Sequence, residues 1–541
     1  MRRLSHVLPA LILTLPLMSG TVEAQETGER PVVELSLDEV VERALESNID
    51  IAVEKYNPET AEQSLRAAQG DYDPFLSAVV DHNDQSSPAT NAFTGGDQVT
   101  TETRNWALGV SQQFTTGTAV SLAFNNRKTD TDSIFSTFNP NFNSSLSVAL
   151  SQPLLRDLKI DASRQNVRIR KNNVEISDTQ FRQVVINVVA NVKTLYYDLI
   201  FAIDNLAAQR NSLALAEKLL EENRIKVRVG TLAPLDVVAA ESEVAGRQEL
   251  VIVAEAALED AEDAIKQVIF PLNDPEMWRL GIVPTDRATA EPREIDVDQA
   301  IQSALANRTD VQITRKSIEN SQISLDFARN QTLPALDLEA SYGGIGVGGT
   351  GLIRDGFGGP VVDTIPGGYG DALSQVLGRD FPTWSVGVRV SYPLLNRRAK
   401  GNAAVARLAK ERAELSLRRL EMQVAREVRS AARRVTTDFQ RVDSTRAARV
   451  LQARRLDAEE KRFAAGMSTN FLVTQAQRDL AFAEVSELQA IADYRKSLIE
   501  FDRVQEAGLG GVTITGGAGN TGGGTGADVN LSSGLGNQGP N

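Results

Sequence analysis

The sequence predicts a mainly α-helical protein that also contains a membrane β-barrel and is built from two copies of one unit. Three observations support this prediction. Landmarks recur in one order in the two halves of the chain. Long stretches show the apolar spacing of coiled coils. Between them lie segments of the length that tilted membrane strands need, about 9–11 residues.

The chain begins with the features of a secretory signal peptide. Two arginines precede an apolar stretch from Val7 to Met18, and a small-residue site ends at Ala24. We therefore expect cleavage before Gln25, which removes residues 1–24. No other window offers roughly 18 uninterrupted apolar residues, so a helical anchor is not expected and any membrane residence must depend on strands.

The duplication defines a first repeat at 33–270 and a second at 296–506. The matching segments keep offsets of 260, 240 and 236 residues, and their shared order makes chance a poor explanation. The pairs are Leu37–Asn48 with Val297–Arg308, Ser151–Leu155 with Ser391–Leu395, and Gly230 with Gly466.

Each repeat has the same predicted succession of elements. A helix of about 33 residues is followed by a β region that proline opens, a very long helix, a short turn and a helix of about 36 residues. In the first repeat these elements are predicted at 37–69, about 75–153, 155–229 and 235–270, and in the second at 297–330, about 336–392, 397–465 and 470–505.

The long helices have the pattern of coiled coils. Their apolar residues step by three or four positions, for example from Phe181 to Leu206 and from Leu417 to Val442. At 1.5 Å per residue, 75 residues reach roughly 110 Å, which is far beyond one globular domain. The two shorter helices of each repeat have together about the length of its long helix. We therefore expect them to stack end to end against it.

The turns after the long helices are predicted to be helical hairpin tips. Gly230 and Gly466 suit the left-handed position that ends a helix. Pro234 suits the first turn of the next helix, and Thr469 or Asn470 can cap its counterpart.

Six segments of nine residues have the size of membrane strands, and apolar and polar residues alternate in several of them. Polar or glycine-rich loops are predicted between them at 84–103, 127–143 and 345–382. A soluble β-sandwich would show similar alternation. A linker rich in proline and charge is predicted at 271–295, and a disordered glycine-rich tail at 507–541.

Composition argues against enzymatic chemistry. Cysteine is absent, and behind the signal the only histidine is His82, in a polar, turn-like stretch. Most nucleophilic and zinc chemistry therefore lacks its side chains, and we expect no catalytic residue, cofactor or metal site. The net charge of −14 argues against nucleic acid as a partner.

These features resemble the TolC or outer membrane efflux protein family. The resemblance rests on the duplicated unit, the Pro-Leu-Leu that ends a strand in each half, and a tip motif present as Arg462–Gly466 and as Gly230 with Asp236–Ala240. It implies a homotrimer whose strands form one barrel in the outer membrane of a Gram-negative-type cell. Its helices would continue as a periplasmic tunnel that meets a periplasmic adaptor protein and an inner-membrane pump.

The resemblance also suggests functional residues. The expected adaptor contacts are the tip residues Gly230, Thr231, Leu232, Pro234, Gly466, Met467 and Ser468. The gate candidates are Leu472, Gln475 and Asp236. Leu472 and Gln475 stand where the protein that gives the family its name carries acidic gate residues, and Ser468 stands where that protein has an arginine. A strongly charged gate is therefore not expected in this chain.

Three alternatives stay open at this point. The segment between Trp106 and Asn126 has the pattern of an extra hairpin, so each chain supplies either four or six strands. The exported substrate is either small molecules or proteins. A coiled-coil structural protein of the periplasm or cell surface, with no channel, is the competing class.

Overall fold

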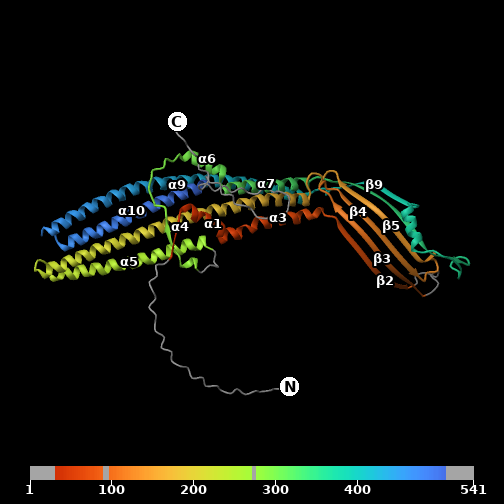
Figure 1. Cartoon of the computed structure of the whole chain (residues 1–541). Helices are drawn as coiled ribbons and strands as arrows, with labels where there is room; N and C mark the ends of the chain where they lie inside the picture. Colours follow the sequence, from red (N-terminus) through yellow and green to blue (C-terminus); the bar gives the residue numbers. More distant parts are fainter. Residues whose placement is uncertain (1–30, 89–96, 271–275, 507–541) are drawn as a thin grey trace, which may run out of the picture.

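The computed structural model describes residues 31–88, 97–270 and 276–506, which form an elongated molecule with helices at one end and a sheet at the other (Figure 1). The predicted signal peptide and the predicted tail lie outside the described residues.

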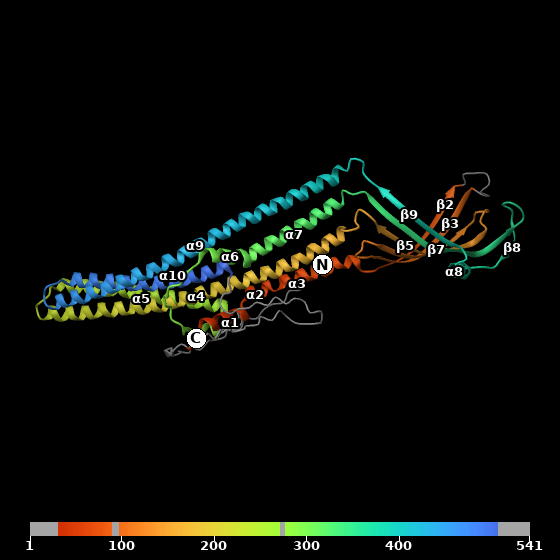
Figure 2. The same cartoon turned by 90° about the horizontal axis from the view of Figure 1, so that it is seen from above.

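In each repeat, shorter helices stack end to end along one long helix, as expected from their lengths (Figures 1 and 2). The long helices are α4 (Ala162–Arg228) and α9 (Arg397–Ala464). The shorter helices of the first repeat are α1 (Leu37–Ser47), α2 (Ile49–Glu54), α3 (Tyr56–Gln69) and α5 (Pro234–Ile269). Those of the second are α6 (Val297–Asn307), α7 (Thr309–Asn330) and α10 (Asn470–Gln505).

The helices form a strip that is four helices wide along its whole length. Near the sheet the order of contacts is α3, α4, α7, α9 (Figure 2), and near the tips it is α5, α4, α10, α9 (Figure 1). One edge of the strip is therefore α3 with α5, and the other is α9. Buried residues such as Val192, Leu199, Val428 and Val435 form the core between the helices.

The prediction of one unbroken helix of about 33 residues at the start of each repeat was wrong. The backbone is extended at Asn48 (ψ 126°) and near-extended at Arg308 (ψ 130°), which are equivalent positions 260 residues apart. The Asn48 carboxamide accepts hydrogen bonds from the backbone N–H groups of Asp50 and Ile51, at 2.9 and 3.2 Å. The Asn48 side chain therefore caps the start of a new helix. The apolar periodicity of the sequence continues across this break, so the periodicity alone does not reveal the break.

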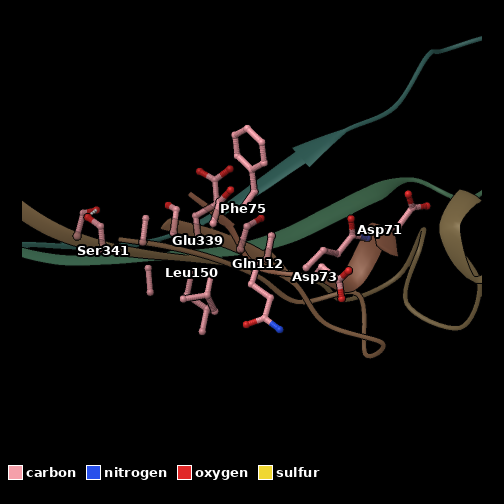
Figure 3. Close-up of a pocket in the computed structure, with 16 residues that line it drawn as sticks. Asp71, Asp73, Phe75, Gln112, Leu150, Glu339 and Ser341 are labelled. Atoms are coloured by element: carbon pink, nitrogen blue, oxygen red, sulfur yellow. Dashed lines mark hydrogen bonds between the residues drawn. The ribbon is translucent and has the colours of Figure 1, made fainter. Parts of the chain in front are cut away.

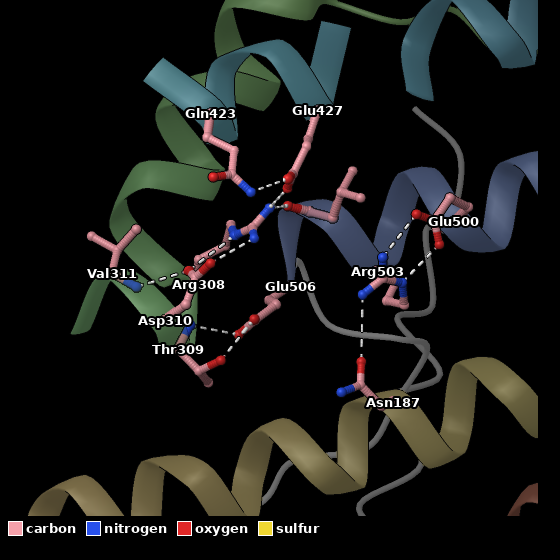
Figure 4. Close-up of polar contacts among 11 residues, drawn as sticks. Asn187, Arg308, Thr309, Asp310, Val311, Gln423, Glu427, Glu500, Arg503 and Glu506 are labelled. Carbon is pink, nitrogen blue, oxygen red and sulfur yellow. Dashed lines mark hydrogen bonds and ion pairs between the residues drawn. The ribbon is translucent and has the colours of Figure 1, made fainter. Parts of the chain in front are cut away.

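At the second break, an ion-pair network replaces the cap (Figure 4). Arg308 lies 2.6 Å from Asp310 and 2.8 Å from Glu427 of α9. Glu506 accepts hydrogen bonds from the backbone N–H and the hydroxyl of Thr309, both at 2.9 Å, and burial raises the pKa of Glu506. The network therefore ties the end of α10 to the α6–α7 break and to α9.

The first long helix begins seven residues later than predicted, at Ala162 rather than at 155. Asp161 is its N-cap and accepts a 2.7 Å hydrogen bond from the backbone N–H of Arg164. Part of α4 is apolar and long enough to cross a bilayer, and it is the only such helix in the described ranges. Of that part, 44% is buried within the chain. Buried residues of α4 such as Val192 and Leu199 belong to the helical core.

The predicted linker contains secondary structure that the sequence pattern did not indicate. β6 (Gly281–Pro284) pairs in parallel with β1 (Val32–Leu35), next to η2 (Met277–Arg279). Tyr196 of α4 is fully buried beside this pair, and its hydroxyl lies 3.0 Å from the carbonyl oxygen of Leu35. The start of the first repeat and the linker are thus anchored to the middle of α4.

The sheet is an antiparallel ladder in the order β2–β3–β4–β5–β7–β9, so six strands run side by side and the extra hairpin exists. A short strand, β8 (Val361–Ile365), pairs with the far end of β7. The strands are β2 (Phe75–Pro88), β3 (Gln98–Gln113), β4 (Ala119–Thr131), β5 (Phe138–Pro153), β7 (Ala335–Arg354) and β9 (Pro382–Ser391).

Five of these six strands have 13–20 residues instead of the predicted nine, and β9 has ten. The predicted loops at 84–103, 127–143 and 345–382 are therefore largely wrong, because strand pairing continues into them. Both faces of the ladder become polar beyond the apolar segment. The alternation of apolar and polar residues therefore ends before the strands do, and the sequence does not indicate their full length.

The glycine run of β7 has a packing role. A Cβ at Gly346 would lie 1.9 Å from the carbonyl oxygen of Ala372, and one at Gly348 would lie 2.3 Å from that of Gly368. Helix α8 (Tyr369–Gly378) can therefore lie directly against the strand. The Tyr369 ring also contacts Trp106 edge-on, with ring centroids 5.3 Å apart.

Candidate functional sites at the sheet and at the helical tips

The six long strands share one apolar face. Register pairs place the even-numbered residues of all six strands on the same side. Large apolar residues follow one another there, and most are exposed within the protomer. This apolar face consists of Leu76, Val80, Trp106, Leu108, Val110, Val120, Leu122, Phe124, Leu146, Val148, Leu150, Leu338, Tyr342, Trp384, Val386, Val388 and Val390.

The opposite, polar face carries mainly serine, threonine, asparagine, glycine and alanine at the odd-numbered positions. An ion pair joins Arg389 and Glu339 at 3.0 Å. A hollow of about 640 Å³ lies near its helical end. In the close-up, Phe75 and Glu339 point to one side of the sheet and Leu150 points to the other (Figure 3).

This division has a physical reason in a bilayer. Lipid-facing positions must be apolar, whereas positions lining a water-filled barrel are polar, and the two alternate along each strand. The apolar face therefore faces lipid and the polar face lines an aqueous interior. Helix α8 covers the glycines at 344, 346 and 348, which are even-numbered, so it lies on the lipid side and outside the interior.

The two helical tips have the same geometry. Gly230 and Gly466 adopt the predicted left-handed conformation, with φ of 79° and 75°. The N–H of Thr231 donates to the carbonyl of Lys226 at 2.9 Å, and that of Met467 donates to the carbonyl of Arg462 at 2.8 Å. Both are Schellman motifs, which use the free carbonyl groups at a helix end.

The predicted tip residues differ in accessibility. Thr231, Pro234 and Met467 are exposed, and Met467 is 75% exposed. Leu232 packs partly against the core between the tips. The Ser468 hydroxyl donates to Glu459 at 2.8 Å. Several further apolar side chains at the tips are exposed, namely Val229, Leu235 and Phe471.

The predicted caps are present only in part. Pro234 begins α5, as predicted. Thr469 holds the N-cap position of α10, but its side chain makes no capping hydrogen bond. Asn470 is buried and points across to the other repeat. Its carboxamide accepts a hydrogen bond from Asn223 of α4 at 2.8 Å and donates to the carbonyl of Asp236 at 3.3 Å.

A group of contacts that the sequence did not predict joins the two hairpins near the tips. We call it the inter-hairpin clamp, and it comprises Asn223 with Asn470, Lys226 with Phe463, and Glu243 with Arg247 and Arg478. The Lys226 ammonium lies 3.5 Å from the centre of the Phe463 ring. The only sequence signal for this contact was the aromatic residue of the tip motif.

Glu243 is the buried centre of the clamp, with 8% exposure. Its carboxylate accepts hydrogen bonds from Arg247 at 2.8 Å and from Arg478 of α10 at 2.9 Å. Burial alone would raise the pKa of Glu243, but the two arginines outweigh burial and hold this pKa below its usual value. Glu243 therefore links α5 to α10 as an anion.

Asp236 and Leu472 lie in the first turns of α5 and α10, and Gln475 lies in the second turn of α10. The Asn470 contact with the Asp236 backbone brings the two first turns together. Leu472 is 38% exposed, and Gln475 is also exposed. Leu472 and Gln475 thus remain accessible on the surface of a single protomer.

Known proteins share this architecture. The family model for outer membrane efflux proteins matches residues 40–269 and again 300–504. The outer membrane protein TolC of Vibrio cholerae serotype O1 is 22% identical over 332 residues, which cover 60% of this chain and 68% of TolC.

Solved structures agree on the fold. The outer-membrane channel OprN superposes with a TM-score of 0.62 at 15% identity, covering 87% of this chain and 90% of OprN. The Campylobacter jejuni CmeC outer membrane channel gives 0.60 at 15% identity, covering 91% and 93%. The family model spans most of the chain in two copies. The chain therefore belongs to the outer membrane efflux protein family and is a channel of the outer membrane with a long helical periplasmic part.

Proposed function

We propose that three copies of this chain assemble into the outer-membrane component of a tripartite export system, joined to a periplasmic adaptor protein and an inner-membrane pump. The observation that supports this best is the open strip. In the described protomer, the strip of helices has two edges that no further helix covers, α3 with α5 on one side and α9 on the other. Each edge continues into an outermost strand of the sheet. Unpaired strand edges are prohibitive in lipid, so copies must close on one another.

The helical edges also complement each other in charge. α9 contains 19 lysine and arginine residues against 9 aspartate and glutamate residues, whereas α5 contains 2 against 9. On α9, Val405, Leu408, Leu415 and Met422 are exposed at spacings of three and seven residues. Such a stripe is typical of a helix that packs against another one.

Native mass spectrometry of detergent-purified mature protein tests the assembly. We expect a complex of three chains. A water-soluble monomer would instead favour the competing class, a coiled-coil structural protein, although the continuous apolar face of the sheet argues against that class.

We propose the tips around Thr231 and Met467 as the adaptor-docking surface. These side chains are exposed, whereas the helices on either side of the tips pack against one another. Thr231→Glu or Met467→Glu should abolish export while trimers still form. Asn211→Glu adds the same charge at an exposed position of α4, away from the tips and from both edges of the strip, so it is the matched control and should export normally. Normal export by both tip variants would place docking elsewhere.

We propose Leu472 and Gln475 as a largely neutral constriction, in which Leu472 excludes water. Asp236 has the alternative role of favouring the start of α5 through the helix dipole. In planar-bilayer recordings the wild type should resist block by multivalent cations, and Leu472→Asp should make it sensitive. Strong block of the wild type that disappears in Asp236→Asn would show that the constriction is a charged ring formed by Asp236 of the first repeat.

The exported cargo depends on what the lining of the channel can recognise. Small neutral side chains predominate on the polar face, and they suit passage rather than recognition. Selection therefore belongs to the pump. Cross-linking the adaptor and pump to the channel in intact cells would distinguish small-molecule efflux from protein secretion.

A further inference from the structure

The two outermost strands define how copies must join. β2 pairs only with β3, and β9 pairs only with β7, so in the described sheet each leaves one edge of backbone groups unpaired. β2 leaves the helical end and β9 returns to it. A β9 beside the β2 of a neighbouring copy would therefore run antiparallel, like every other pair in the ladder.

The same two strands continue the two edges of the helical strip. α3 leads into β2, and β9 leads into α9. An α9 edge that packs against the α3–α5 edge of the next copy therefore brings β9 beside that copy's β2. The faces also agree, because even-numbered residues are apolar in both strands, with Leu76 and Val80 on one and Val386 and Val388 on the other.

Every strand between these edges belongs to the membrane wall. In the extra hairpin, Leu108 and Val110 of β3 are paired with Phe124 and Leu122 of β4. These four side chains continue the apolar face without a gap. If the hairpin lay outside the membrane, water would contact them. β4 cannot be an edge, because β3 and β5 already occupy both of its sides.

We propose that three copies, each with six long strands, close one barrel of eighteen strands in which each β9 pairs with the β2 of the next copy. This inference rests on the proposed trimer and adds the strand number and the seam. Barrel diameter grows roughly in proportion to strand number, so the interior would be about 1.5 times as wide as that of a twelve-stranded barrel with the same tilt.

The interior of such a barrel is open. Barrels of roughly 16–18 strands leave an aqueous channel unless something fills it. In this chain α8, the helix in the β7–β9 connection, lies on the lipid side. The narrowest part of the conduit therefore lies in the helical tunnel and not in the barrel wall.

Cysteine cross-linking tests the seam, because the natural chain contains no cysteine. Ser77→Cys on the polar face of β2 is combined in turn with Thr383→Cys, Ser385→Cys, Gly387→Cys or Arg389→Cys on the polar face of β9. After oxidation, one register of this series should convert most of the protein into covalent trimers that reducing agent returns to monomers.

A matched series tests the twelve-stranded alternative in which the β2–β3 hairpin lies outside the wall and β4 forms the seam. Ser121→Cys on β4 is combined with the same four changes and should give no intermolecular link. Ser341→Cys with Ser385→Cys is the oxidation control, because those hydroxyl oxygens lie 2.8 Å apart within one chain. It should lose its free thiols and remain a monomer on a denaturing gel.

The outcomes separate the two proposals. Covalent trimers from the Ser77 series alone place β2 at the seam, and the unbroken ladder from β2 to β9 then gives six strands per copy and eighteen in the barrel. Trimers in native mass spectrometry that link through Ser121, or that link in neither series while the control oxidises, would overturn the strand number and leave the trimer intact. Absence of trimers altogether would overturn the proposed assembly itself.

Discussion

The two repeats of this chain agree in their helices and differ in their strands. Both have a helix break at the equivalent positions Asn48 and Arg308, and both end their long helix at a left-handed glycine. In the sheet, the first repeat supplies four strands and the second supplies two long ones with β8 and α8 between them. The helical part is thus the constant half of the unit, and the membrane part is the half that has changed.

The difference follows from what each part must satisfy. A helix in the tunnel contacts partners along its whole length, so an insertion there disturbs the packing of every later turn. An antiparallel wall accepts a whole hairpin, because two added strands restore the direction of the edge and keep the alternation of faces. In the second repeat, the added residues instead form α8, which packs against the glycines of β7.

The largest expected effect concerns the extra hairpin. Leu108→Arg places a charge on the lipid side of β3 and should cost about 2–4 kcal/mol near the bilayer midplane. Ala107→Arg, one residue away on the interior side, should be tolerated. Yield of folded, detergent-extracted trimers measures both. Equal tolerance of the two variants would show that the extra hairpin lies outside the membrane wall.

The same pair of changes can be made in the second repeat. Val386→Arg on the lipid side of β9 should match Leu108→Arg, and Gly387→Arg on the interior side should match Ala107→Arg. A large effect in β9 with none in β3 would mean that the two repeats contribute differently to the membrane part, and it would contradict a wall that contains all six long strands.

The helix breaks should differ in stability although they are equivalent in position. Arg308→Ala removes two ion pairs and leaves Asp310 and Glu427 without their partner, which should lower local stability by about 2 kcal/mol. Asn48→Ala removes a helix cap and should lower it by about 1 kcal/mol. Hydrogen exchange at α7 and α2 measures each effect. A larger loss at Asn48 would contradict the stabilising role of the Arg308 network.

The inter-hairpin clamp should depend on pH. The pKa of Glu243 is lower in the folded protein than its ordinary value of 4.5. Its contribution is therefore complete above that value and is lost as pH falls through the lower, folded pKa. Exchange protection at the start of α10 should decrease in that acidic range, and Glu243→Gln should remove this dependence. An unchanged acid profile in Glu243→Gln would assign the effect to other groups.

The smallest expected effect is at the tips. A Cβ at Gly230 or Gly466 meets no atom within 4 Å, so only the left-handed backbone opposes a side chain. Gly230→Ala and Gly466→Ala should each cost about 1 kcal/mol, and the two values should be equal within error. Thermal unfolding of the trimers measures both. Clearly unequal values would show that one tip makes contacts that the other lacks.

Periodic features were predictable from the sequence, and non-local contacts were not. The repeats, the stacking of short helices along long ones and the glycine-ended tips follow from local patterns, and the structure confirms them. The break at Arg308 was missed because the partner that stabilises it, Glu427, lies 119 residues away. The strand ends were missed because both faces become polar beyond the lipid.

The site shows the same limit. Thr231 and Met467 were predicted from turn chemistry and are exposed at the tips. The inter-hairpin clamp was not predicted, because Asn223 and Asn470 are 247 residues apart and the sequence pattern suggested only a local capping role for Asn470. The extra hairpin was visible as alternation in the sequence, but only the pairing of β4 on both sides establishes that it lies inside the sheet.

Single-particle imaging of the mature protein in lipid nanodiscs can count the strands of the wall, because a view along the channel axis displays each of them. We expect a threefold-symmetric barrel of eighteen strands with β9 beside the β2 of the next copy. A closed wall of twelve strands would contradict the strand number, and a β9 beside any strand other than the β2 of the next copy would contradict the seam.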